Sequence, residues 1–144
     1  MQAAVGCAQI KKFPSFVVRR KENFARLKEG LLDLQDSFIL PEPCENSDPC
    51  WFGFLITCKE GCDRNKVVRY AEEQGVQTRM LFSGNLTKHP CFDQMRREGR
   101  GYRIAGDLTV TDRIMTDTFW IGVYPGMTDA MIDRMIRVLK EAVK

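Results

Sequence analysis

The segment Trp51–Cys58, with the sequence WFGFLITC, limits the fold of this chain more than any other feature. Its apolar side chains recur at every second position, which predicts a strand whose inner face carries Phe52, Phe54, Ile56 and Cys58. Gly53 is expected to leave a gap on the opposite face. Because the strand alternates and is not apolar throughout, it predicts a sheet that is antiparallel or mixed, not wholly parallel.

Three further segments are predicted to be strands: 38–40, ended by Pro41, then 76–82 and 118–123. The strand 76–82 runs directly into a polar loop, Ser83–Pro90, which contains Gly84 and Asn85. A loop at the end of a strand is a usual place for binding residues. A plain surface loop with a turn at Gly84 is the alternative interpretation of this segment.

Amphipathic patterns predict the helices, which are expected at residues 2–34 (with a kink or a new start at Pro14), 64–74, 91–97, 107–115 and 129–143. Asp63 and Thr128 stand where N-caps belong, and Gly75 stands where a helix ends. Met127 and Ile132 are spaced as a hydrophobic staple. An apolar stripe in the first helix is expected to run from Phe13 and Val17 to Leu34. Together, strands and helices predict a two-layer α/β (α+β) sandwich, with a short, mainly antiparallel sheet packed against long helices.

The bulk composition is that of one compact domain spanning residues 1–144, with 44% hydrophobic and 28% charged residues. The net charge of +3 is spread over mixed signs, so a nucleic-acid partner is not expected. No apolar run approaches the roughly 18 residues that span a membrane, and the N-terminus lacks the order of a secretory signal. A cytoplasmic location is therefore expected. The six cysteines lack two close CxxC pairs, which favours reduced thiols and no bound metal.

No catalytic constellation is complete in this sequence. His89 is the only histidine, and no glycine-rich phosphate loop leads from a strand into a helix. The guanidinium groups of Arg79 and Arg113 are candidates for binding a phosphate or a carboxylate. The alternative for each is a salt bridge to Asp107, Asp112 or Asp117. Similarly, Trp51 and Phe52 are candidates for stacking on a flat ring, or else they belong to the core.

Several stretches resemble one enzyme family. The first 31 residues are similar to the interdomain helix of the fold-type I pyridoxal-phosphate sugar aminotransferases. The later stretches SDPCWFGFLIT, TRMLFSGNLTKHPCF and GDLTVTDRIMTDTFWIGVYPGMT resemble more specifically the CDP-4-keto-6-deoxyglucose 3-dehydratases, which serve lipopolysaccharide deoxysugar synthesis. The resemblance covers essentially the whole chain. It implies the C-terminal small domain of such an enzyme, with residues 1–34 as the interdomain helix and the large cofactor-binding domain absent.

The resemblance also implies which groups the large domain carries and which groups this chain carries. The large domain of the family carries the phosphate cup, the catalytic lysine or histidine and, in the dehydratase branch, an iron–sulfur cluster. This chain is therefore expected to hold no catalytic, cofactor or metal residue and to be inactive alone, whereas the full-length enzyme uses pyridoxal or pyridoxamine phosphate. The substrate-side residues that carry over are Phe52, Phe82, Asn85, Thr87 and Arg113. The segment Met95–Gly101 is longer than the corresponding segment expected in the dehydratase branch.

Several functions stay open. The first is the small domain of a nucleotide-sugar 3-dehydratase, whose partners are the large domain, the nucleotide-sugar substrate and further copies of the enzyme in a homo-oligomer. A sugar aminotransferase of the same family is the second, and a stand-alone binding module that kept the fold is the third. The small apolar residues Ala3–Ala8 bear on this choice, because an interdomain surface left uncovered is expected to self-associate.

Overall fold

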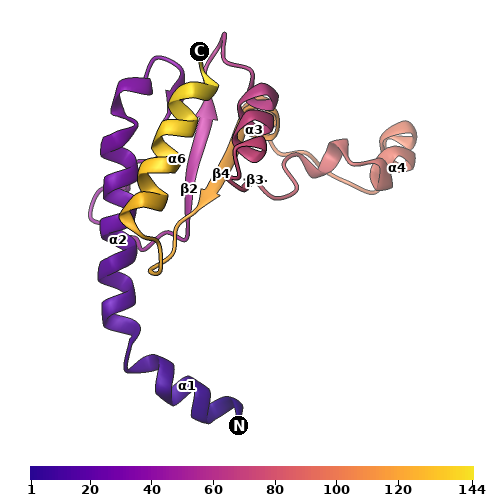
Figure 1. Ribbon diagram of the computed structural model, residues 1–144. Coiled ribbons are helices and arrows are strands. Elements are labelled where there is room, and N and C mark those ends of the chain that lie inside the picture. The colour runs from indigo at the N-terminus through magenta and orange to yellow at the C-terminus, as the bar shows by residue number, and fades with distance from the viewer.

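A four-stranded antiparallel sheet forms the centre of the molecule, and the computed structural model describes all residues 1–144 (Figure 1). The strand order is β1-β2-β4-β3, and all three neighbouring pairs are antiparallel. The strands are β1 (Phe38–Ile39), β2 (Gly53–Cys58), β3 (Thr78–Met80) and β4 (Thr118–Gly122). The predicted antiparallel sheet is confirmed.

The helices are α1 (Gln2–Ile10), α2 (Phe13–Gly30), α3 (Arg64–Glu73), α4 (Asp93–Glu98), α5 (Thr109–Asp117) and α6 (Asp129–Ala142). Short 3-10 turns occupy Leu32–Leu34, Leu86–Lys88 and Pro90–Phe92. None of the helices combines the length and the apolar character that crossing a bilayer requires.

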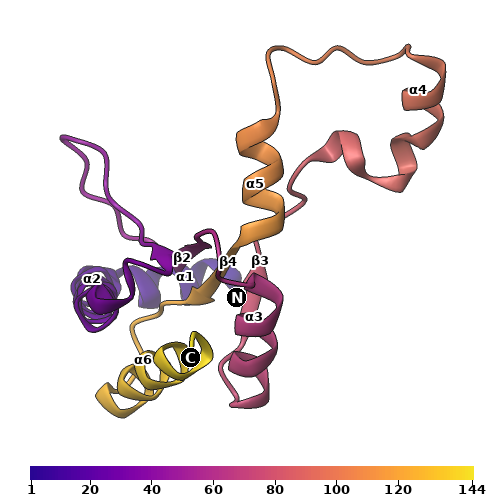
Figure 2. The same cartoon turned by 90° about the horizontal axis from the view of Figure 1, so that it is seen from above.

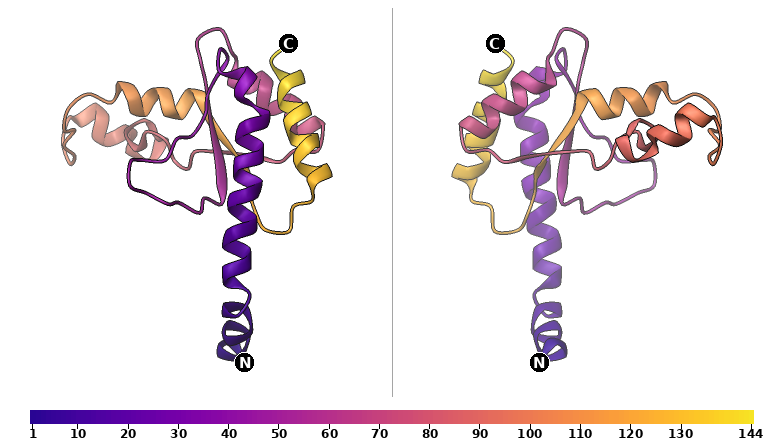
Figure 3. Two further views of the ribbon diagram at one scale, coloured as in Figure 1. Left: turned by 90° about the vertical axis from the view of Figure 1, so that its left-hand side faces the viewer. Right: turned by 90° about the vertical axis from the view of Figure 1, so that its right-hand side faces the viewer.

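Only one face of the sheet is covered by long helices. Helices α2, α3 and α6 lie together on that face, whereas α5 and the segment that carries α4 extend away from the opposite side (Figures 2 and 3). The hydrophobic core lies between the sheet and these helices, and its largest fully buried side chains include Phe54, Ile56, Phe119, Ile121, Leu27, Leu31, Ile132 and Leu139. This arrangement confirms the two-layer sandwich.

The predicted helix ends are also confirmed. The Asp63 carboxylate accepts hydrogen bonds from two backbone amides in the first turn of α3, and the Thr128 hydroxyl accepts one from the amide of Met131. Gly75 follows α3 with a φ of +76°, a conformation that glycine adopts without steric cost. Met127 and Ile132 are both buried, as a hydrophobic staple requires.

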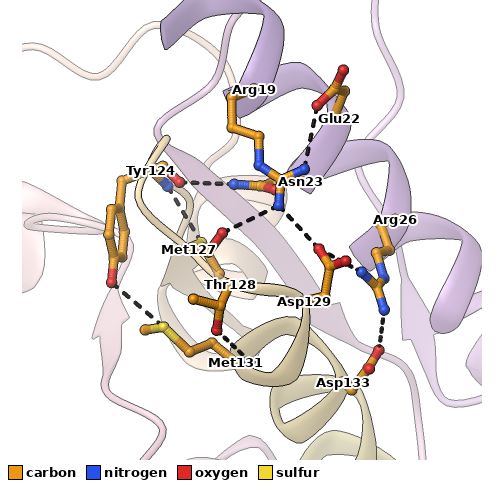
Figure 4. A network of polar contacts seen from close by, with 10 residues as sticks. All are labelled: Arg19, Glu22, Asn23, Arg26, Tyr124, Met127, Thr128, Asp129, Met131 and Asp133. Atoms are coloured by element: carbon orange, nitrogen blue, oxygen red, sulfur yellow. Dashed lines mark hydrogen bonds and ion pairs between the residues drawn. The ribbon is translucent and has the colours of Figure 1, made fainter.

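Polar contacts fix helix α2 against the start of α6 (Figure 4). The Asp129 carboxylate pairs with Arg19 at 3.0 Å and with Arg26 at 2.7 Å, and Arg26 also reaches Asp133 at 2.7 Å. Hydrogen bonds from Arg19 and Arg26 hold the pKa of Asp129 below its ordinary value. These groups are exposed, so each pair contributes little stability and mainly sets the register of the two helices.

Asn23 is a buried polar side chain in this interface. Its side chain is 1% exposed, and its Nδ2 donates a hydrogen bond of 2.9 Å to the backbone carbonyl of Tyr124 (Figure 4). Tyr124 lies in the turn between β4 and α6, so this bond ties that turn to the middle of α2. The Tyr124 carbonyl also accepts a 3.3 Å hydrogen bond from the amide of Met127, so Asn23 adds a second bond that joins this turn to α2.

The long first helix predicted at 2–34 is divided in the structure. A turn at Lys11–Lys12 separates α1 from α2, and Pro14 occupies the first turn of α2, where a proline needs no amide donor. The apolar stripe is buried only from the middle of α2 onward, because Phe13 is 60% exposed and no residue of α1 is buried. The first part of the chain thus extends away from the body (Figure 1).

The side-chain alternation predicted around Phe52 is wrong at its first position. Strand β2 begins at Gly53, and Phe52 is 59% exposed, with its ring against Trp120 on the uncovered face. The reason lies in the core, where the Phe24 ring of α2 contacts Trp51 at 4.9 Å and Phe54 at 4.8 Å between centroids. Trp51 therefore takes the position beside α2 that the alternation assigns to Phe52.

Other boundaries differ by a few residues. The helix expected at 107–115 occupies Thr109–Asp117, and β3 is limited to three residues. Met80 is exposed although the alternation predicts a buried side chain, because β3 is an edge strand. Met131, expected on the apolar face of α6, is exposed as well.

The Asn23 contact generates a stability prediction. Asn23→Asp replaces the donor by a carboxylate that faces the Tyr124 carbonyl in a buried site, so the free energy of unfolding is expected to fall by about 3 kcal/mol. Urea unfolding at neutral pH, followed by tryptophan fluorescence, measures the loss. The matched control is Asn65→Asp, on the exposed first turn of α3, which should change stability by less than about 0.5 kcal/mol. Equal effects of the two substitutions would contradict the buried role of Asn23.

Candidate functional site

The uncovered face of the sheet carries a row of large side chains. In the strand registers, Leu55 of β2 and Arg79 of β3 both lie opposite Trp120 of β4. Directly paired residues project from the same face of a sheet, so these three side chains stand side by side across it. The alternate residues Phe54, Phe119 and Thr78 are buried on the helix side. The helix-covered face of the sheet is therefore buried, whereas the opposite face is more exposed.

Aromatic side chains form a shallow pocket of about 210 Å³ on this open face. It is lined by Phe52, Phe82 and Trp120 together with Gly53 and two leucines, and it is bordered by Trp51, whose ring also packs against Phe24 of α2. The Phe52 and Trp120 rings meet edge to face, with 5.4 Å between centroids and an interplanar angle of 88°. A Cβ atom at Gly53 would stand 2.7 Å from the Trp120 ring, so only glycine lets the indole lie across strand β2.

Phe82 stands at the rim of this pocket in an unusual conformation. Its φ is +45°, and its amide donates a 2.8 Å hydrogen bond back to the carbonyl of Met80. A bulky residue with a positive φ is strained, and such strain gathers at functional sites. The side chain is 78% exposed, so the turn presents a large ring to the outside.

The loop after Phe82 is held by Asn85. This side chain is 3% exposed, and its Oδ1 accepts hydrogen bonds from the amide of Thr87 at 3.0 Å and from the Thr87 hydroxyl at 2.7 Å. Its Nδ2 donates at 2.7 Å to the carboxylate of Asp112 in α5. Asn85 thus joins the start of the loop to the helix that ends it.

Asp112 connects the two sides of this loop. One carboxylate oxygen accepts from Asn85, and the other pairs with Lys88 at 2.7 Å. The contacts with Lys88 and Asn85 hold the pKa of Asp112 below its ordinary value. Met115, one turn further along α5, accepts a weak hydrogen bond from the amide of Asn85. The base of the segment 83–108 is therefore fixed although α4 stands away from the body (Figure 2).

The structure brings the predicted substrate-side residues together in two groups. Phe52 and Phe82 share the aromatic pocket, and Asn85 and Thr87 bond to each other at the loop base. Thr87 also lines a second cavity, of about 270 Å³, in the segment that carries α4. Arg113 joins neither group, because it lies on α5 and its Nε is 3.8 Å from Asp117, the salt bridge that was its alternative role.

Two residues of this face were not singled out by the sequence patterns. Trp120 forms the floor of the pocket. In TFWIGV it alternates with inward-facing residues, and this alternation was the signal in the sequence that it faces outward. Asp112 was named only as a candidate partner of an arginine, whereas it binds Asn85 and Lys88. No short-range pattern predicts that contact, because 27 residues separate Asp112 from Asn85.

The lysine-bearing cavity of this chain does not fit a bound pyridoxal phosphate. Among the larger cavities, the one that holds lysines contains Lys66 and Lys144 beside Asp36, Glu60 and Asp63, whose carboxylates repel a phosphate ester. Cys58 and Cys62 lie close together, but burial raises the pKa of both thiols and so disfavours the thiolate that binds metals. No group of three or more metal-ligating side chains occurs.

The Asn85–Asp112 bond generates the prediction for this site. Asn85→Asp places two carboxylates against each other, so hydrogen exchange of the Thr87 amide is expected to accelerate, with a loss of about 2 kcal/mol. The double variant Asn85→Asp/Asp112→Asn exchanges donor and acceptor and should recover most of the protection. If the double variant exchanges as fast as the single one, this hydrogen bond does not hold the loop.

Comparison with known proteins places these features in a family. The chain is 46% identical to the lipopolysaccharide biosynthesis protein RfbH of Salmonella typhimurium, over 98% of this chain and 32% of that protein. It is 43% identical to a dTDP-4-dehydro-2,6-dideoxy-D-glucose 3-dehydratase of Saccharopolyspora spinosa, over 99% of this chain and 30% of that enzyme. The chain thus spans about a third of the length of these relatives.

Solved structures show the same fold. DesV of S. venezuelae, in complex with a ketimine intermediate, superimposes with a TM-score of 0.81 at 20% identity, covering 100% of this chain and 36% of that one. A GDP-4-keto-6-deoxymannose-3-dehydratase with bound GDP-perosamine gives a TM-score of 0.80 at 22% identity, over 94% of this chain and 34% of that one.

The family assignment follows from the extent of the match. The sequence pattern of the DegT/DnrJ/EryC1/StrS aminotransferase family covers residues 1–140. The open sheet face and the anchored loop at 83–88 thus lie in a region that the family pattern covers in full. The chain belongs to the DegT/DnrJ/EryC1/StrS aminotransferase family.

Proposed function

We propose that this chain provides the C-terminal small domain of a pyridoxal- or pyridoxamine-phosphate-dependent nucleotide-sugar 3-dehydratase of lipopolysaccharide deoxysugar synthesis. The observation that carries the proposal is the 46% identity to Salmonella RfbH across 98% of the chain. Because that match spans only 32% of RfbH, we assign the rest of the catalytic apparatus to the residues beyond it. The open face of the sheet is the surface available for that apparatus and for the substrate.

In this proposal, residues of the open face shape the substrate side of the active site. Phe52 and Phe82 supply apolar walls that exclude water, since both line the same pocket and both are exposed. Asn85 positions the loop, because its amide is already fully engaged with Thr87 and Asp112. Arg113 is half exposed and weakly paired, so its guanidinium is available to contact an anionic part of the substrate.

The cofactor is assigned to the large domain and not to this chain, whose lysine-bearing cavity repels phosphate. When bound, such a cofactor supplies the electron sink for removal of the sugar hydroxyl. The groups described here bind, orient and shield the sugar. We also propose a cytoplasmic homo-oligomer, with the wholly exposed α1 covered by the large domain in the complete enzyme.

A sugar aminotransferase of the same family is the second candidate. The name of the family itself favours it, since the matching pattern is that of aminotransferases. A stand-alone binding module is the third, and it is supported by the self-contained core beneath the sheet. The three candidates differ in what the chain does alone and in what it does when joined to the rest of a relative.

The first test concerns the chain alone. After mixing with pyridoxal or pyridoxamine phosphate and dialysis, no absorbance is expected between about 320 and 430 nm, the range of the bound cofactor. The full-length E. coli GDP-4-keto-6-deoxy-D-mannose-3-dehydratase, whose solved structure holds hydrated PLP, is treated in the same way as the positive control. Stoichiometric retention of cofactor by the 144-residue chain would show that it carries a cofactor site of its own.

The second test joins the chain to a relative. In a chimera, this chain replaces the matching third of Salmonella RfbH, and the chimera is expected to restore lipopolysaccharide synthesis in a strain that lacks RfbH, because the two segments share 46% of their residues. RfbH without that third is the negative control.

Product analysis then separates the two enzymatic candidates. Incubation of the chimera with CDP-4-keto-6-deoxyglucose should give a product that has lost the 3-hydroxyl as water. A product that gains an amine nitrogen would instead favour the aminotransferase. A chimera that folds and binds the cofactor but does not convert CDP-4-keto-6-deoxyglucose would favour the stand-alone module.

A further inference from the structure

Two cysteines meet where strand β2 passes into helix α3. Cys58 is the last residue of β2 and is 1% exposed, whereas Cys62 is partly exposed in the turn before the N-cap Asp63. The amide of Cys62 donates a 3.0 Å hydrogen bond to the carbonyl of Lys59, so this turn folds back toward the end of the strand. The two thiols also form a hydrogen bond with each other. The proposed function assigns no role to this thiol pair.

A cavity of about 400 Å³ opens beside the more exposed of the two thiols. Cys62 lines this cavity, and Cys58 does not. The wall carries charges of both signs, among them Lys66, Asp36 and Glu60. None of these three side chains takes part in an ion pair within the chain. The cavity therefore suits a small ligand that presents both anionic and cationic groups next to a reactive sulfur.

The cavity is separate from the surfaces assigned above. It shares no lining residue with the aromatic pocket on the open face of the sheet. Figure 1 shows β2 running toward the end of the molecule where the C-terminus lies, whereas α1 and the N-terminus lie at the opposite end. The thiol pair thus lies away from both the proposed substrate surface and the helix that we propose the large domain covers.

The surroundings of the two thiols give them different roles. Burial raises the pKa of both Cys58 and Cys62, so both are protonated at neutral pH and react slowly. The hydrogen bond between them lowers the pKa of Cys62 and raises that of Cys58. Because the thiolate is the attacking species and only Cys62 reaches the cavity, Cys62 is the thiol that meets an external disulfide first.

We propose that Cys62 is a site of oxidative modification by a small disulfide that carries carboxylate and ammonium groups, as glutathione disulfide does, and that Cys58 resolves the adduct into an internal disulfide. In the first step the Cys62 thiolate attacks one sulfur of the small disulfide. A mixed disulfide forms, the original S–S bond breaks, and the released thiolate takes up the proton that Cys62 has lost. The cavity binds the attached group during this step.

The second step is internal to the chain. The Cys58 sulfur attacks the sulfur of Cys62, the bond between Cys62 and the small molecule breaks, and a second small thiol leaves with the proton of Cys58. In sum, the two protein thiols lose two electrons and two protons, and one small disulfide is reduced to two thiols. The product links the last residue of β2 to the turn before α3.

The test uses the full chain with only this thiol pair present. Its other four cysteines are replaced by serine, and circular dichroism confirms that the chain folds: Cys7, Cys44, Cys50 and Cys91. Incubation with glutathione disulfide, followed by mass spectrometry, is expected to show one glutathionyl adduct. That adduct should then give way to a chain that has lost two hydrogen atoms and no longer reacts with a thiol reagent. Peptide mapping should locate the new bond between Cys58 and Cys62.

Single substitutions in this background separate the two steps. In Cys58→Ala the glutathionyl adduct on Cys62 is expected to accumulate, because the resolving thiol is absent. Cys62→Ala is expected to stay unmodified, because Cys58 is buried. Both variants are compared by circular dichroism before the reaction is read.

A further variant tests the cavity. Lys66→Gln should slow the reaction with glutathione disulfide about threefold, since an exposed charge contact with the carboxylates of the ligand is lost. The same variant should leave the reaction with the uncharged 2-hydroxyethyl disulfide unchanged. Lys11→Gln, at an exposed position of α1, is the matched control and should alter neither rate.

Each outcome supports or overturns part of the proposal. A chain that keeps both thiols reduced, or an adduct found on Cys58, would overturn the site. An adduct on Cys62 that persists although Cys58 is present would overturn the resolving role of Cys58. Equal effects of Lys66→Gln on the two disulfides would overturn the assigned class of ligand. Because none of these measurements uses the cofactor or a nucleotide sugar, their failure is distinguishable from failure of the proposed function.

Discussion

The pairing of β2 with β4 is the interaction on which the rest of the structure depends. These two central strands align Phe54 with Ile121 and Ile56 with Phe119, and all four side chains are buried beneath α2 and α6. The intervening residues Leu55 and Trp120 point to the opposite face, since successive side chains of a strand alternate. A single register therefore sets both the core and the candidate binding face, and a slip by one residue would exchange them.

Much of this architecture is predictable from local patterns. Alternation identifies β2 and β4, and the caps at Asp63 and Thr128 locate α3 and α6, because these signals act within a few residues. The inward position of Phe52 was predicted wrongly, because the Phe24–Trp51 contact decides it from another element. The loop anchor between Asn85 and Asp112 has no sequence signal, since it joins side chains that only the folded chain brings together.

The uneven distribution of contacts fits a chain that spans about a third of its relatives. The core below the sheet is complete, whereas α1 contributes no buried residue and α4 stands apart from the body. The open face retains exposed aromatic side chains, which an isolated soluble surface rarely keeps without use. The fold thus divides into a layer of helices and strands around a buried core and a set of exposed surfaces. The candidate site lies on the second.

The most direct test of this account uses the two tryptophan indole N–H signals in a ¹⁵N-labelled NMR spectrum of the chain. Single Trp→Phe variants assign the signals to Trp51 and Trp120. Addition of CDP-4-keto-6-deoxyglucose, the substrate in the proposed function, is predicted to shift the Trp120 indole signal and the amides of β2 and β4, while the amides of α6 on the covered face stay unchanged. Shifts confined to the helices, or no shift at all, would contradict the assignment of the open face as the functional surface.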